Sequence, residues 1–124
     1  MNNKDIENRL ISFSINVSEL VCNLPGHPIL FNLRDQIIRS STSVTLNYGE
    51  AQSASSKKDF IFKITIVLKE LRETQLNLKM INKLELFPRN NEIDDLLNEN
   101  DQLLAIFYRT LQTAKMNLYK NQKK

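Results

Sequence analysis

Four stretches of the chain repeat apolar residues in alternating steps of four and three. The first stretch runs from Ile6 to Leu24, and Pro25 follows it directly. Such spacing places the apolar side chains on one face of a helix that packs against other helices. No stretch alternates with a period of two between hairpin turns. The pattern therefore predicts four helices, over about 4–24, 29–52, 57–84 and 91–119.

The segments between these helices carry residues that end one helix and begin the next. Pro28 suits the first turn of the second helix. Ser56, followed three residues later by Asp59, has the pattern of a capping box at the start of the third. The 87–90 segment contains a proline that interrupts the third helix, and Asn91 can cap the fourth. Because such short connections make consecutive helices neighbours, the predicted fold is an all-α, antiparallel up-down four-helix bundle.

Length and composition restrict the function more than they define it. With 124 residues, of which 41% are hydrophobic and 25% charged, the chain suits a single folded domain, residues 1–124. No apolar stretch is long enough to span a membrane and no secretory signal is visible, so we expect a cytoplasmic protein. One histidine and one cysteine leave no catalytic triad, zinc site or Glu-x-x-His metal pair, and Gly26 and Gly49 alone form no phosphate loop. We therefore expect that the protein is not an enzyme and that it binds no cofactor or metal ion.

The first and third helices each carry a second apolar face, about 150–160° from the core face. A monomer could use these residues to widen its core, and scattered surface apolar residues are common. A row of five large ones on the third helix exceeds ordinary scatter, which favours a homo-oligomer that buries both faces. The predicted interface consists of Ile11, Ile15, Phe62, Ile66, Leu76, Met80 and Leu84.

Positive charge is concentrated in the third helix. The net charge is +3, and residues 55–87 hold seven basic and four acidic residues. Five cations fall within an arc of about 80° and could follow a phosphate backbone, although a charged helix face is often only solvated. The candidate nucleic-acid-binding residues are Lys58, Lys69, Arg72, Lys79 and Lys83, with Arg34 and Arg39 of the second helix as lesser candidates.

Polar residues interrupt the apolar faces of the second and third helices. Ser43, Asn47 and Glu50 form a row at helical spacing, and Glu70 and Glu73 lie one turn apart. A buried polar network that fixes helix register is favoured over a ligand site, because buried polar groups need partners. Glu70 and Glu73 could also form salt bridges on the helix surface. The rival interpretation is a metal-dependent enzyme that uses the three glutamates. Candidate partners for the network are Arg39, Lys63 and Arg72.

Two segments resemble a known family. In the second helix these are Gln36-Ile37-Ile38-Arg39 and Ser43-Val44-Thr45-Leu46-Asn47-Tyr48-Gly49-Glu50-Ala51. The matching residues of the third helix, counted from the residue just before it, are Ser56-Lys57-Lys58-Asp59-Phe60, Lys63 and Leu68-Lys69-Glu70-Leu71-Arg72-Glu73-Thr74. The family is the four helix bundle protein family, also described as the ribosomal-RNA intervening-sequence protein family. Its members include reading frames carried in insertions within bacterial large-subunit ribosomal RNA genes, and it is related to accessory variability proteins of diversity-generating retroelements.

The resemblance covers about Leu10 to Leu118 and implies more than the residues alone. It implies a cytoplasmic bacterial homopentamer without enzymatic activity that binds RNA or DNA through basic surfaces, and a reverse transcriptase as a further partner. Ile38 stands where many members have a second basic residue, and Ile66-Val67 stands where many have Gly-Ser. The alternative function is a protein–protein scaffold or adaptor that binds no nucleic acid.

Overall fold

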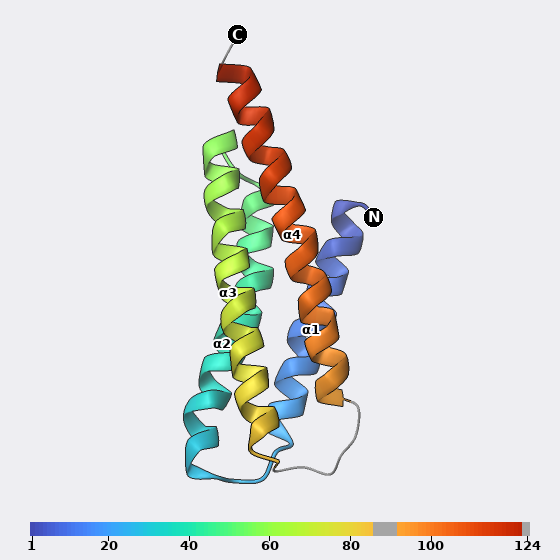
Figure 1. Cartoon of the computed structure of the whole chain (residues 1–124), viewed down its shortest axis with the longest axis vertical. Coiled ribbons are helices and arrows are strands. Elements are labelled where there is room, and N and C mark those ends of the chain that lie inside the picture. Colours follow the sequence, from blue (N-terminus) through green and yellow to red (C-terminus); the bar gives the residue numbers. More distant parts are fainter. Residues whose placement is uncertain (86–91, 123–124) are drawn as a thin grey trace.

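The computed structural model describes residues 1–85 and 92–122 and consists of four helices. They are α1 (Asn3–Cys22), α2 (Pro28–Gln52), α3 (Lys57–Lys83) and α4 (Glu92–Gln122). Consecutive helices run in opposite directions along one long axis (Figure 1). The described residues contain no strand, so the predicted all-α four-helix bundle is confirmed.

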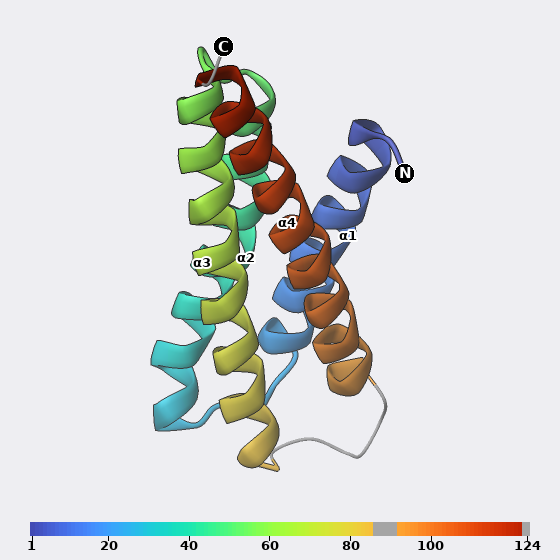
Figure 2. The ribbon, with the colours of Figure 1, turned by 45° about the horizontal axis from the view of Figure 1, so that its top comes forward.

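The helices are arranged around the bundle in chain order. α2 packs against α1 and α3, and α3 packs against α4, whereas α1 and α4 share the smallest contact. Both ribbon views show that α4 extends well beyond the start of α1, so one end of the bundle consists of α2, α3 and α4 only (Figures 1 and 2). Among the described residues, none of the helices has the length and apolar content that crossing a bilayer requires.

A capping box has two hydrogen bonds, and the start of α3 forms one of them as predicted. Ser56 is the N-cap, and its hydroxyl accepts a hydrogen bond of 3.0 Å from the backbone N–H of Asp59. The Asp59 carboxylate accepts instead from the N–H of Ser55, at 3.3 Å, one residue before the cap. α1 begins with a complete capping box, formed by Asn2 and Asp5, which was not predicted from the sequence.

The remaining predicted boundaries lie close to the observed ones. α2 begins at Pro28, as expected, and the imidazole of His27 accepts a hydrogen bond from the N–H of Ile29. α1 ends at Cys22 rather than at residue 24. The break predicted at 87–90 and the cap predicted at Asn91 lie outside the described residues.

The core joins apolar side chains from all four helices. Phe13 of α1 and Phe107 of α4 are among its largest fully buried side chains, and Tyr48 of α2 meets Phe107 edge to face at 5.6 Å between ring centroids. Truncating an aromatic side chain at such a site costs about 3–5 kcal/mol. In α4 the buried face also includes Leu96, Asn100 and Leu103.

Candidate nucleic-acid interface

Helix α3 presents its predicted cations to solvent. All five are exposed, and they extend over nearly the whole helix, which is roughly 40 Å long. Within residues 1–85 and 92–122, none of the five forms an ion pair with a carboxylate. Their charge is therefore available to an external anion. They are Lys58, Lys69, Arg72, Lys79 and Lys83.

Arg72 also contacts the neighbouring helix. Its guanidinium carbon lies 4.9 Å from the ring centroid of Tyr108 on α4, a cation–π contact. The two side chains line a groove of about 440 Å³ between α3 and α4. The complete lining is Thr65, Leu68, Lys69, Arg72, Glu73, Leu76, Tyr108 and Leu111.

The two arginines of α2 both contact other groups of the chain. Arg39 donates from Nη2 to a carboxylate oxygen of Glu73 at 3.0 Å, and its Nη1 lies 3.8 Å from Glu70. Arg34 is half-buried and donates from Nη2 to the backbone oxygen of Leu24 at 3.4 Å. Arg34 and Arg39 therefore each have a partner within the chain, although the side chain of Arg39 remains 58% exposed.

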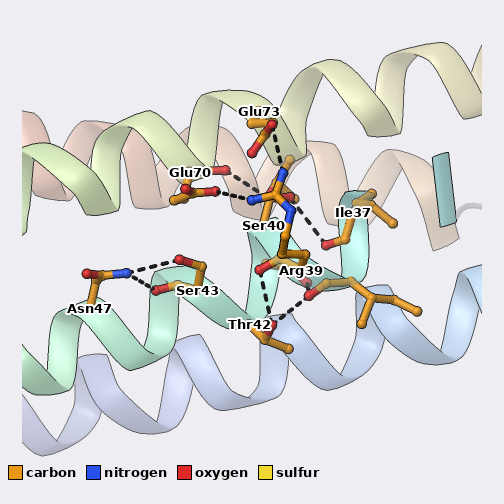
Figure 3. A network of polar contacts seen from close by, with 11 residues as sticks. Ile37, Arg39, Ser40, Thr42, Ser43, Asn47, Glu70 and Glu73 are labelled. Atoms are coloured by element: carbon orange, nitrogen blue, oxygen red, sulfur yellow. Dashed lines mark hydrogen bonds and ion pairs between the residues drawn. The ribbon is translucent and has the colours of Figure 1, made fainter. Parts of the chain in front are cut away.

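The polar residues predicted to share one network instead form separate local contacts. Ser43 and Asn47 bond within α2, where the Asn47 amide donates to the hydroxyl and the backbone oxygen of Ser43 (Figure 3). Glu50 is exposed and pairs with Lys63 of α3 at 2.8 Å. Arg72, an expected partner, points to Tyr108 instead.

The third contact joins α2 to α3 through Arg39, Glu70 and Glu73 (Figure 3). Glu70 is 8% exposed, and its Oε2 atom has no hydrogen-bond partner within residues 1–85 and 92–122. Burial raises the pKa of Glu70, and the nearby Glu73 carboxylate raises that pKa further. The charges of Arg39 and Lys69 act in the opposite direction.

The three glutamates of the rival enzyme interpretation do not converge. Glu50 pairs with Lys63, whereas Glu70 and Glu73 meet Arg39, about three turns away along α2. Across the described residues, no three His, Cys, Asp or Glu side chains are grouped so that they could hold a metal ion.

The predicted oligomer face is largely exposed in the single chain. Phe62 and Leu76 are each 60% exposed, and Ile11, Ile15 and Met80 are exposed as well. The other two predicted residues are partly buried, and one of them, Leu84, packs against the core. A mostly apolar groove of about 330 Å³ lies at this face, lined by Ile29, Leu33, Leu76, Lys79, Met80, Lys83 and Leu84.

Comparison with known proteins identifies the family. The sequence profile of the 23S rRNA-intervening sequence protein family matches residues 2–109. The chain belongs to this family. It is also similar to a crystallised protein of unknown function from the S23 ribosomal protein family of Bacteroides thetaiotaomicron, with 27% identity and a TM-score of 0.80 over 90% of this chain and 99% of that one. No curated protein matches the chain by sequence.

Family membership confirms the resemblance inferred from the motifs of the second and third helices. Tyr108 was not among the residues predicted from the sequence, although it lines the groove together with Arg72. The signal available in the sequence was an aromatic residue beside the apolar face of the fourth helix. Its pairing with Arg72, far away in the sequence, is visible only in the fold.

Proposed function

We propose that this member of the 23S rRNA-intervening sequence protein family is a cytoplasmic, non-catalytic accessory protein that binds RNA or DNA. We further propose that it does so as a homo-oligomer, specifically a homopentamer. The observation that carries the proposal is the line of exposed cations on α3, none of which forms an ion pair with a carboxylate among the described residues. The name of the matching family, which refers to 23S ribosomal RNA, supports RNA as the first nucleic acid to test.

A line of cations binds nucleic acid mainly through phosphates. Such contacts position a protein without reading sequence, so we expect low sequence selectivity. Each neutralised phosphate releases counterions, and the affinity therefore falls steeply with salt. In an oligomer the α3 lines would be repeated, and a long nucleic acid could bind several of them at once.

The test is fluorescence anisotropy of labelled structured RNA and duplex DNA at about 50 and 200 mM salt. A variant with Lys69→Glu, Arg72→Glu and Lys79→Glu removes three cations of the α3 line. A matched variant with Lys4→Glu, Lys115→Glu and Lys120→Glu makes the same change in net charge at exposed positions on α1 and α4. We expect the first variant to lose binding and the second to keep most of it. Absence of binding by the unaltered protein at the lower salt would overturn the proposal.

A scaffold function is the second candidate, because α3 and the adjoining groove also expose a row of large apolar side chains. A nucleic-acid enzyme such as a reverse transcriptase is the partner we propose for that face. The α3 charge-reversal variant separates the two functions, since a scaffold that binds through apolar contacts keeps its protein partner when the cations are reversed. Co-purification of a reverse transcriptase with both the unaltered protein and this variant would support the scaffold.

A further inference from the structure

The groove between α3 and α4 combines three features: positive charge, an aromatic ring and apolar side chains. Its walls carry the cations Lys69 and Arg72, its α4 side carries the ring of Tyr108, and its lining includes the apolar side chains of Leu68 and Leu111. Its volume of about 440 Å³ lies within the range of small-ligand pockets, about 300–1,000 Å³. We propose that this groove binds an unpaired nucleotide of a single-stranded nucleic acid, an inference that rests on the proposed function.

The Arg72–Tyr108 pair provides the surface for the base. The guanidinium is held over the ring at 4.9 Å, and both side chains are exposed, with Tyr108 at 40%. Unpaired bases stack on aromatic rings and on arginine guanidinium planes, and every base has such a face. A pair that is already assembled loses little further side-chain freedom when a base stacks on it.

Lys69 provides the contact for the phosphate. It lies one turn before Arg72 on the same helix face, and it is exposed. The acidic member of the groove, Glu73, is held by Arg39 at 3.0 Å, so much of its negative charge is compensated from α2. The groove is therefore suited to a phosphodiester beside a stacked base.

A paired base fits this arrangement poorly, because its faces are covered by its neighbours in the duplex. Sequence-tolerant binding of single strands relies on bases that are free to leave the stack. The groove thus narrows the proposed partner from nucleic acid in general to single-stranded segments such as loops and ends.

The experiment uses the full chain and oligonucleotides of about eight residues, the size of one short binding site. Anisotropy is measured with oligouridine, oligodeoxythymidine and an abasic oligomer that has the phosphates but no bases. We expect the unaltered protein to bind both base-containing oligomers at least about fivefold more tightly than the abasic one. The uridine and thymidine arms distinguish RNA from DNA as the source of the strand.

Variants of Tyr108 test the stacking surface directly. Tyr108→Leu should lower the affinity for oligouridine at least about fivefold and leave the abasic oligomer unaffected, while Tyr108→Phe keeps the ring and most of the affinity. Tyr119→Leu is the matched control, because it removes an exposed tyrosine of the same helix outside the groove. Photocrosslinking of the unaltered protein to an oligomer that contains 4-thiouridine should label the peptides of Arg72 and Tyr108, and this result does not depend on the folding of a variant.

The outcomes separate this inference from the proposed function. If the α3 charge reversal abolishes binding while Tyr108→Leu changes nothing and no crosslink forms in the groove, the nucleotide site is refuted and the accessory function remains. Equal affinity for the abasic and base-containing oligomers also refutes the site. Failure to bind any oligomer, structured RNA or duplex refutes both.

Discussion

The hydroxyls of Ser40 and Thr74 lie 2.7 Å apart in the interior of the bundle, and both residues are fully buried. They join the middle of α2 to the middle of α3. Thr74 also donates to the backbone oxygen of Glu70, and Ser40 lies 3.3 Å from the backbone oxygen of Ile37. Because Thr74 gives its proton to Glu70, the Ser40 hydroxyl donates its one proton across the interface to Thr74, and the Ile37 oxygen is its alternative acceptor.

This pair should behave as one unit in a double-mutant cycle. Thr74→Val and Ser40→Ala each remove one hydroxyl and leave the other without its cross-helix partner, so each should lower the free energy of unfolding by about 1–2 kcal/mol. The double variant should lose less than the sum of the two, by at least about 0.5 kcal/mol. Urea unfolding at a fixed protein concentration measures this; strictly additive losses would show that the two hydroxyls do not cooperate.

The buried carboxyl of Glu70 should make stability depend on pH. Because the pKa of Glu70 is raised in the folded chain, its contribution to stability is complete below the unfolded-state pKa and is lost as the pH rises through the folded-state pKa. Glu70→Gln stays neutral, so the variant should gain stability relative to the unaltered protein between about pH 4 and pH 8.

The measurement is urea unfolding across this pH range, with Glu19→Gln as the control at an exposed position. A difference between Glu70→Gln and the unaltered protein that stays constant with pH would contradict the prediction. The Glu70→Gln variant also loses the ion pair with Arg39, which lowers its gain in stability where the Glu70 carboxyl is ionised. The gain keeps its direction, because the pKa of Glu70 is raised even with Arg39 beside it.

Asn100 should be sensitive to a change of one atom. It is fully buried on α4, and in the amide orientation that satisfies both groups it donates to the backbone oxygen of Leu71 and accepts from the N–H of Gln75. Asn100→Asp removes the donor and buries an acid, which should cost at least about 2 kcal/mol. Asn100→Leu removes the whole amide and should cost less, because Leu71 and Gln75 are correctly spaced to bond each other within α3. Thermal and urea unfolding of the two variants test this order, and a larger loss in the leucine variant would contradict it.

The exposed apolar row should govern the oligomeric state. Light scattering of the unaltered protein at micromolar concentration should give a mass near five times the 14.4 kDa of one chain. Phe62→Glu combined with Met80→Glu should shift the mass towards the monomer, because the charges would have to be buried in the interface. Met116→Glu on α4 is the control at a similarly exposed apolar position outside the predicted face. A monomeric unaltered protein would contradict the prediction.

The amino-acid sequence by itself determined the secondary structure, the fold class and the family. An apolar step of four and three residues defines one face of a helix, whatever that face packs against in the fold. Helix starts are also set locally: Pro28 has a fixed φ and no N–H that needs a partner, and Ser56 caps the next helix with its hydroxyl. Local chemistry was also sufficient to place the α3 cations on a common line, because helical geometry alone fixes their angular positions.

Tertiary structure decided which polar side chains meet. Arg39 finds Glu73 and Arg72 finds Tyr108 only after neighbouring helices have adopted a particular rotation and register. The 3.6-residue period shows which residues share a face of one helix, but it carries no information about which residues of the neighbouring helix contact that face. For that reason the sequence predicted a single polar network where the fold forms separate contacts, and it could not reveal the groove that Arg72 and Tyr108 line together.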